Sequence, residues 1–298
     1  MIVGVVGLGL MGSSIANRLL STGYQVTVYN RDITKAKPFA KRGAIVAKSP
    51  KEMAEDCNFI LICVSNIEAI NKVSFGKNGI VASNPKRLIV ADSSTISPEQ
   101  SLYCNEIFRK YNIDHLAMPV MGGPAAAERG ELVLIISGNK NAFKIAKPIV
   151  EKIAKNIFYI GNNVDSANAL KLALNLNIAL IATAIAEGII LVKRSGVAPG
   201  IFVKILNSTY FKTGLSQIKG PKMVDNNFET SFHLRNMLKD LELTTITAQN
   251  IGISLPLTTL AQQIFRAASN SGFSEQDYTA IAAFLAKING MNGKKRRS

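Results

Sequence analysis

Short, largely apolar segments rich in β-branched residues alternate with helical stretches up to about residue 160 of this 298-residue chain. These segments are apolar on both faces, which is typical of strands in a parallel sheet that helices cover on both sides. They are Ile2–Val6, Gln25–Tyr29, Phe59–Val64, Leu88–Asp92, His115–Met118 and Leu132–Ser137. Helical stretches such as Met11–Ser21 and Ile67–Ser74 separate most of them. The alternation predicts an α/β domain built on a doubly wound sheet.

After Gly161 the strand pattern stops, and a long helix rich in alanine and leucine is expected over Ser166–Arg194. Further helices are expected at Pro199–Leu206, Gly214–Val224, Leu234–Asn250, Leu257–Ser269 and Glu275–Ile288. An all-α domain therefore follows the α/β domain, and the long helix links the two. We place the first domain at residues 1–162 and the second at 163–298.

The long helix contains a charge-free run, Leu172–Ala186, that resembles a membrane segment. The run is shorter than the roughly 18–20 residues that a membrane-spanning helix needs, and Asn175 and Asn177 interrupt it. We expect a buried core helix and no association with a membrane.

The cysteines and histidines exclude the common metal-site patterns. Cys57, Cys63 and Cys104 form no Cys-x-x-Cys pair, and the two histidines, His115 and His233, lie far from them. Neither a metal site nor a disulfide framework is expected. No basic segment precedes the first apolar run, so a secretory signal is not expected either. We expect a cytoplasmic protein.

The formal net charge is +15, which favours anionic partners. Part of the excess lies in the tail Lys294–Arg297, and the rest is scattered. Without an aromatic RNA-binding motif or zinc-finger spacing, we expect solvated lysines and no specific nucleic-acid partner.

A glycine-rich turn follows the first predicted strand and opens the first predicted helix. It reads Gly7, Leu8, Gly9, Leu10, Met11 and Gly12. In a G-x-G-x-x-G turn the first glycine allows the tight turn, the second lets a pyrophosphate approach the backbone, and the third lets the helix pack on the strand. Phosphates then bind the free N–H groups of the helix. The motif predicts a Rossmann-type dinucleotide site.

The end of the second predicted strand indicates which dinucleotide binds there. NAD enzymes usually carry an acidic residue at this place, whereas this chain has Asn30 and Arg31, with Lys35 one turn later. Uncharged Asn30 removes the repulsion against a 2′-phosphate, and Arg31 offers it a bidentate partner. NADP is therefore the expected cofactor, and the nearby Asp32 leaves weaker use of NAD open. Alternatively, Arg31 is an ordinary surface residue.

Further motifs follow in a fixed order along the chain. They are Asp92–Pro98 with the sequence DSSTISP, Pro119–Gly123 with PVMGG, Gly130–Leu132, Lys171 with Asn175, and Lys239–Leu241 with KDL. Together with the glycine-rich turn, this series resembles the β-hydroxyacid dehydrogenase family, which includes 3-hydroxyisobutyrate dehydrogenase and the glyoxylate/succinic semialdehyde reductases. The resemblance spans nearly the whole chain and implies hydride transfer between a nicotinamide and a small anionic hydroxy acid or semialdehyde.

The resemblance implies that Lys171 and Asn175 are the catalytic pair and that Lys239 closes over the cofactor or substrate from the second domain. Hydride transfer at a carbinol carbon also needs a partner for the hydroxyl proton, and both histidines are poorly placed for that role. A lysine at the start of an apolar helix more often extends its ammonium to solvent. The resemblance reverses that preference and places the active site in the interdomain cleft.

Polar residues also follow the predicted strands at the carboxyl edge of the sheet, where ligands of such folds bind. Ser65, Asn66 and Thr95 are expected to contact the cofactor, Thr95 by the resemblance, and Ser94 is expected to contact the substrate. Ser97 with Gln100 reads as a capping box, which is a structural role.

Gly122 and Gly123 allow the chain to turn its N–H groups toward a substrate carboxylate, or they form a plain tight turn before Pro124. The resemblance favours substrate binding and adds Met121, where relatives often have serine. Relatives also differ at Ala117, Asp165 and Ala167, so we expect a pocket unlike that of the 3-hydroxyisobutyrate enzymes.

Two other interpretations remain. An imine reductase shares the scaffold, but that group replaces the lysine that this chain retains at Lys171. A noncatalytic NADP-binding module that binds nucleic acid would use the basic surface. We also expect a homodimer or homotetramer through the all-α domain.

Overall fold

The computed structural model describes residues 1–85 and 87–291, so the basic tail Lys294–Arg297 lies outside the described residues. The chain divides into two compact units, Met1–Lys171 and a second that begins at Leu172. The division falls inside the long helix α8 (Asp165–Arg194), whereas the sequence pattern placed it ahead of that helix, after residue 162.

The first unit is built on a mixed sheet with strand order β3-β2-β1-β4-β5-β6-β8-β7, in which β9 pairs with β8. The strands are β1 (Ile2–Val6), β2 (Gln25–Tyr29), β3 (Ile45–Val46), β4 (Phe59–Ile62), β5 (Ile89–Asp92), β6 (Asp114–Ala117), β7 (Val120–Met121), β8 (Leu132–Gly138) and β9 (Ala154–Tyr159). From β3 to β6 in this order, each strand runs parallel to the next, which confirms the doubly wound α/β prediction.

Strand β8 departs from the parallel arrangement, because it runs antiparallel to both β6 and β7. The connection from β6 to β8 contains only the two-residue β7 and the short helix α6 (Pro124–Arg129). β7 lies in this connection and itself pairs antiparallel with β8, so the chain folds back on itself between the two strands. The sheet is therefore parallel from β3 to β6 and antiparallel where β8 joins it.

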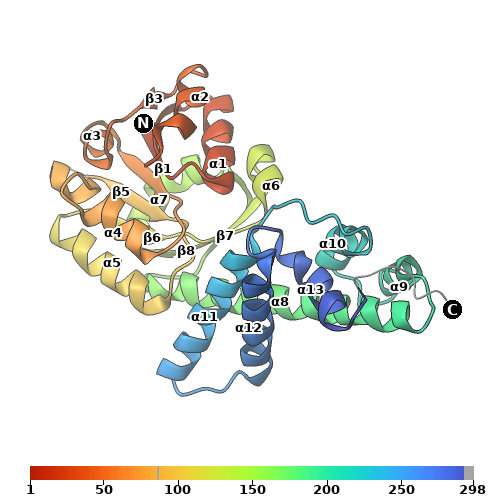
Figure 1. Ribbon diagram of the computed structural model, residues 1–298. Helices are drawn as coiled ribbons and strands as arrows, with labels where there is room; N and C mark the ends of the chain where they lie inside the picture. The colour runs from red at the N-terminus through yellow and green to blue at the C-terminus, as the bar shows by residue number, and fades with distance from the viewer. Residues whose placement is uncertain (86, 292–298) are drawn as a thin grey trace. The chain divides into compact units, whose positions relative to one another are not determined.

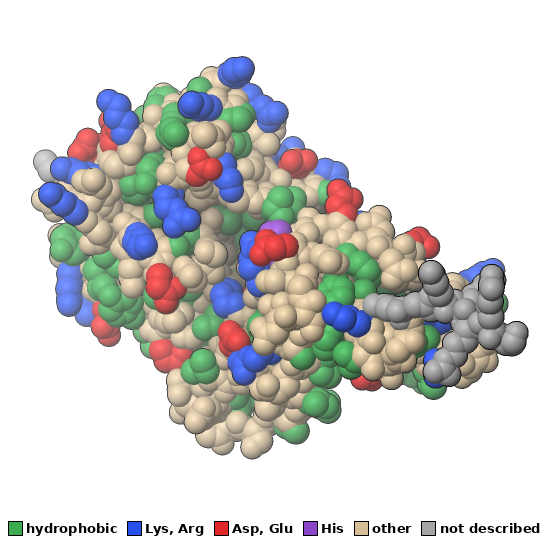
Figure 2. Space-filling view, viewed as in Figure 1, with side chains coloured by type: hydrophobic (Ala, Val, Ile, Leu, Met, Phe, Trp, Pro, Cys, Tyr) green, Lys and Arg blue, Asp and Glu red, His purple; other side chains and the backbone are tan. Residues whose placement is uncertain are grey.

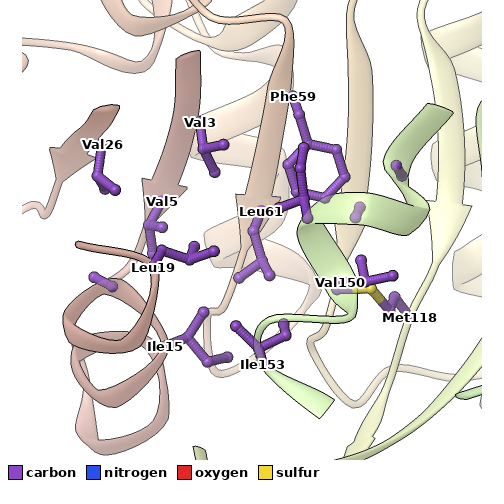
Figure 3. Close-up of a cluster of buried hydrophobic side chains, with 14 of the residues drawn as sticks. Val3, Val5, Ile15, Leu19, Val26, Phe59, Leu61, Met118, Val150 and Ile153 are labelled. Carbon is purple, nitrogen blue, oxygen red and sulfur yellow. The ribbon is translucent and has the colours of Figure 1, made fainter. Parts of the chain in front are cut away.

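Helices cover both faces of this sheet (Figure 1). One face packs against α1 (Leu10–Ser21), α6 and α7 (Lys140–Val150), and the other against α3 (Pro50–Asp56), α4 (Ile67–Phe75) and α5 (Pro98–Lys110). A short helix, α2 (Lys37–Ala40), follows β2. Figure 3 shows the first core, where Val5 of β1, Ile15 and Leu19 of α1, and Leu61 of β4 point toward one another. This packing fixes the start of α1 at the carboxyl end of β1.

The second unit is all-helical, as predicted. After α8 it contains α9 (Pro199–Leu206), α10 (Gly214–Val224), α11 (Leu234–Asn250), α12 (Pro256–Ala268) and α13 (Ile281–Ile288). Among the described residues, α8 is the helix with the length and hydropathy to cross a membrane. Its Ala179, Ala182 and Ala186 are fully buried in the core of this unit, however, as a core helix requires.

The helix expected over Glu275–Ile288 begins later than predicted, because Asp277 has another role. The Asp277 carboxylate is 1% exposed, accepts hydrogen bonds from Ser231, and pairs with the Lys219 ammonium at 2.8 Å. Removing one partner of such a buried pair usually destabilises a protein strongly. The pair joins α10 to the segment that precedes α13, and Ser231, which bonds to both partners, adds the segment that precedes α11. Helix α11 carries Lys239 and Asp240.

Candidate functional site

The glycine-rich turn joins β1 to α1, and two of its glycines are required by close backbone contacts. Gly7 has a φ of 95°, and a Cβ there would lie 2.2 Å from the carbonyl oxygen of Cys63. A Cβ on Gly12 would lie 1.9 Å from the carbonyl oxygen of Gly7. These contacts match the turn and packing roles expected of the first and third glycines.

The middle glycine faces open space. A Cβ on Gly9 would meet no atom within 4 Å, and Gly9 precedes α1 without any side-chain cap. The first turn of α1 has no acidic residue; Leu10 is exposed there, and Met11 packs against the core. An uncapped helix start beside an open glycine is the environment that binds a pyrophosphate. The residues therefore fit a dinucleotide, with Gly9 and the N–H groups of α1 holding the phosphates.

Asn30 at the end of β2 braces this turn. Its Oδ1 accepts a hydrogen bond from the Leu8 N–H at 2.9 Å, and its Nδ2 donates to the Asp32 carbonyl at 3.0 Å. Asn30 was expected to contact the cofactor, and the structure shows its amide holding the loop on which the cofactor would lie.

The segment after Asn30 carries the cationic residues Arg31 and Lys35, and its acidic residue, Asp32, forms hydrogen bonds within the same segment. Asp32 accepts hydrogen bonds from the Thr34 hydroxyl and N–H, which lower the pKa of its carboxyl. Arg31 is exposed. Lys35 and Arg42 line a hollow of about 270 Å³ that also contacts Leu8. The sequence pattern did not single out Arg42, because it lies in the turn after α2, well beyond the end of the strand.

The loops after β4 and β5 contain the other expected cofactor and substrate residues, and two of these have structural roles. The Asn66 side chain caps α4 by accepting from the Ala69 N–H at 3.0 Å. Ser94 is 3% exposed, and its hydroxyl accepts from the Val64 N–H at 3.1 Å. Ser65 is exposed and Thr95 is half-buried on the same edge. Ser94 therefore joins the loops after β4 and β5, and its contact with a substrate stays a prediction.

The capping box predicted at the start of α5 is confirmed. The Ser97 hydroxyl accepts from the Gln100 N–H at 3.2 Å, and the Gln100 side chain accepts from the Ser97 N–H at 3.0 Å. This reciprocal pair fixes where the loop after β5 ends.

Lys171 contacts a segment 51 residues earlier in the chain, within the first unit. Its Nζ donates to the Val120 carbonyl oxygen at 2.8 Å and lies 3.2 Å from the Met121 sulfur. Lys171 is half-buried. The structure thus brings together the lysine and the PVMGG segment, two motifs that the sequence could relate only by resemblance.

The paired glycines follow directly after Met121. Gly122 is exposed and has a φ of 120°, and a Cβ there would lie 2.9 Å from Leu132 Cδ2. Gly123 precedes α6, and a Cβ at Gly123 would meet nothing within 4 Å. Met121 also packs against a small core that includes Ala117 and Ala167. A backbone turn with a positive φ, next to an ammonium group, is chemically suited to a carboxylate.

In the second unit, Asn175 is joined to the KDL motif of α11. Asn175 is 3% exposed, and its Nδ2 donates to the Asp240 carboxylate at 2.6 Å. Asp240 is 1% exposed and also pairs with the Lys239 ammonium at 3.0 Å. Asp240 was not among the expected site residues. The sequence could have indicated it, because Asp240 is an acidic residue on the same helix face as Met237, Leu241 and Thr244, which are buried.

Comparisons with known proteins agree with this arrangement. Residues 2–161 match the family model described as the NAD binding domain of 6-phosphogluconate dehydrogenase, and residues 166–285 match that described as NAD-binding of NADP-dependent 3-hydroxyisobutyrate dehydrogenase. Glyoxylate/succinic semialdehyde reductase 2, chloroplastic, from Arabidopsis thaliana is 29% identical over 95% of this chain and 79% of its own length.

Two 3-hydroxyisobutyrate dehydrogenases are also similar. The mitochondrial enzyme of Mus musculus is 30% identical over 95% of this chain and 86% of its own length. The crystal structure of the Salmonella typhimurium enzyme has a TM-score of 0.87 at 26% identity and covers 95% of this chain and 99% of that one. The chain therefore belongs to the β-hydroxyacid dehydrogenase family and is an NAD(P)-dependent oxidoreductase that acts on CH–OH groups.

Proposed function

We propose that the protein uses NADP to interconvert a small 3-hydroxy acid and its semialdehyde, with Lys171 as the proton donor in reduction and the acceptor in oxidation. The observation that carries this proposal is the 2.8 Å contact of Lys171 with Val120, which holds an ammonium group beside Gly122 and Gly123. The cofactor, when bound, supplies or accepts the hydride. The N–H groups of the glycine pair bind the carboxylate, and the half-buried lysine holds the proton for the substrate oxygen.

A screen of small semialdehydes with NADPH, followed by the nicotinamide absorbance, tests this proposal directly. The supporting result is turnover of a semialdehyde that carries a carboxylate, together with much slower turnover of the same aldehyde without the carboxylate. Equal rates for the two would contradict a site that binds the carboxylate.

The preference for NADP rests on the cations after β2. We expect Arg31→Asp to weaken NADPH binding by about 1–3 kcal/mol, because a charge-assisted contact is lost and a negative charge is added. NADH binding should change much less. The Kd values for both cofactors, measured by nicotinamide fluorescence, check this.

Lys41→Asp is the matched control, since Lys41 is also exposed but follows α2, ten residues further along the chain than Arg31. It makes the same change in net charge and should alter NADPH affinity little. Equal catalytic efficiency of the unmodified protein with NADPH and NADH would show that the preference does not exist.

Met121 is expected to make the pocket apolar and to limit the binding of glyoxylate. Its sulfur is only a weak acceptor near Lys171, and it offers no hydrogen to a carboxylate. We expect Met121→Ser to lower KM for glyoxylate by a factor that corresponds to about 0.5–1.5 kcal/mol, the net contribution of one hydrogen bond. The KM of a branched semialdehyde should not fall in Met121→Ser. The ratio of kcat/KM for glyoxylate to that for the branched semialdehyde, compared between the variant and the unmodified protein, measures the change in preference.

Met121→Leu is the control for lost packing, because it retains an apolar side chain without a hydroxyl. Since Met121 packs against a small core, both variants are expected to lower the melting temperature. If the substrate ratio of Met121→Ser equals that of Met121→Leu, the residue acts only through packing.

No specific observation favours an imine reductase or a noncatalytic NADP-binding module that binds nucleic acid. The retained Lys171 weighs against imine reduction. In the face that Figure 2 shows, Lys and Arg side chains are spread over the surface and do not gather in one stripe, as a nucleic-acid surface would. We further propose that the protein assembles as a homodimer or homotetramer through the second unit, where Ile251, Leu257 and Leu260 are more than half exposed.

A further inference from the structure

A second hollow lies at the edge of the sheet opposite the glycine-rich turn. It has a volume of about 550 Å³ and is lined by Asn105, Arg109, His115, Lys140, Asn141 and Asn162, among others. These residues lie where β6 begins, where α5 ends and where α7 starts after β8, and Figure 1 labels these elements. The nucleotide site lies at the carboxyl ends of the parallel strands, so this hollow at their amino ends is a separate place in the same unit.

The wall of the hollow contains a buried histidine whose ring is unsatisfied. His115 is 2% exposed, and neither of its ring nitrogens has a hydrogen-bond partner among the described residues. One side of the ring packs near Phe108, with 5.2 Å between the ring centroids. Buried polar groups in folded proteins nearly always have partners. The ring nitrogens expose almost no surface, so an occupant of the hollow would change the surroundings of the imidazole without bonding to it.

The charges around the hollow favour an anion. Arg109 and Lys140 are both exposed, and among the described residues neither forms an ion pair. The lining contains one carboxylate, Asp114, which accepts from the Asn139 side chain at 3.0 Å. Burial lowers the pKa of His115 to about 4, so the ring is neutral at pH 7. The lining therefore carries a net charge of about +1, given two cations and one anion.

The remaining polar side chains of the lining are amides, which donate and accept hydrogen bonds without adding charge. Asn105, Asn141 and Asn162 contribute three of them. The Asn139 side chain caps α7 by accepting from the Asn141 and Ala142 N–H groups, so the helix start is already satisfied. The two cations are thus the groups that a ligand would engage. A guanidinium binds phosphate and carboxylate oxygens in a bidentate manner.

We propose that this hollow binds a small oxyanion, a phosphate or carboxylate compound whose charged group lies between Arg109 and Lys140, close enough to His115 to change the surroundings of its ring. The volume is in the range of small-molecule sites. Val164 also lines the hollow, and its carbonyl oxygen accepts from the Ser101 and Ser137 hydroxyls just before α8 begins. An occupant would therefore support the start of the helix that carries Lys171.

The chain has only two histidines, which makes the ring of His115 a clean probe. We would record ring spectra of protein labelled with ¹⁵N-histidine and saturated with NADPH, so that added anion cannot enter the nucleotide site. Inorganic phosphate and acetate are titrated separately, with chloride at equal ionic strength as the reference. His115→Phe assigns the signals. The expected result is a saturable shift of the His115 signals while those of His233 stay in place.

Variants test whether the shift comes from this hollow. Arg109→Ala and Lys140→Ala should each raise the Kd of the anion at least about fivefold, the effect of losing about 1 kcal/mol from a charged contact. Lys144→Ala, one turn further along α7 and exposed, should leave the Kd unchanged. A response to phosphate alone identifies a phosphorylated ligand, and a response to acetate alone identifies a carboxylate. No saturable shift with either anion, or an equal Kd in Lys140→Ala, would overturn the proposal.

Discussion

Lys171→Ala is expected to lose at least about 100-fold in kcat, the usual scale of a general acid–base group. The reason is geometric as well as chemical. The Lys171 ammonium is held at 2.8 Å from the Val120 carbonyl, beside the glycine pair proposed to bind the carboxylate, so its removal leaves no comparable proton donor at that place. NADPH affinity should barely change, because the nucleotide is held by the glycine-rich turn. Stopped-flow turnover and nicotinamide fluorescence measure the two quantities separately.

Lys171→Arg distinguishes proton transfer from a purely electrostatic role. A guanidinium keeps the positive charge, but it does not release its proton at neutral pH. We expect Lys171→Arg to be nearly as slow as Lys171→Ala. Lys193→Ala, an exposed lysine in the last turn of the same helix, should retain full activity. Near-normal turnover of Lys171→Ala would mean that the proton comes from another group and that the role inferred from the family does not apply here.

Gly9→Ala is expected to weaken nucleotide binding, whereas Gly12→Ala is expected to lower the stability of the fold, although both glycines lie in one turn. A Cβ on Gly9 meets no protein atom within 4 Å, and its φ of −76° is one that alanine adopts readily. The melting temperature should therefore stay close to that of the unmodified protein. The methyl group would occupy the space through which the pyrophosphate approaches the backbone, so nucleotide affinity should fall at least about tenfold, or roughly 1.4 kcal/mol.

Gly12→Ala should lower the melting temperature itself, because its Cβ would lie 1.9 Å from the Gly7 carbonyl oxygen and neither backbone segment can move freely. Thermal unfolding without nucleotide, followed by titration with NADPH, separates the two effects. Normal NADPH affinity in Gly9→Ala would show that the phosphates do not lie on this turn.

The local pattern of the sequence was sufficient for much of the fold. Strands β1 and β2 begin and end where alternation and β-branched residues placed them, and α5 begins at the capping box of Ser97. These features depend on backbone propensity and on side chains within a few residues, so neighbouring residues encode them. The change from alternating elements to helices alone was equally visible, and it correctly separated an α/β unit from an all-α one.

Strand direction was not encoded in this way, because an apolar run reads the same in either direction. β8 runs antiparallel to β6 and β7, and β9 was not predicted because its exposed positions, among them Lys155 and Asn156, interrupt the apolar pattern of a strand. Small polar residues at the sheet edge were equally ambiguous. Whether Asn30, Asn66 or Ser94 binds a ligand or braces a loop depends on which backbone N–H lies within 3 Å or so, and packing decides that.

The candidate site shows the same division. The sequence by itself determined the glycine-rich turn and, through the order of its motifs, the prediction that Lys171 and Asn175 are the catalytic pair. Only the tertiary structure placed Lys171 on the Val120 carbonyl, buried Asp240 against Asn175, and left the His115 ring unpaired in the wall of a second hollow. Local sequence sets backbone conformation and the face on which a side chain lies, whereas contacts between residues 50 or more positions apart arise only when the elements pack together.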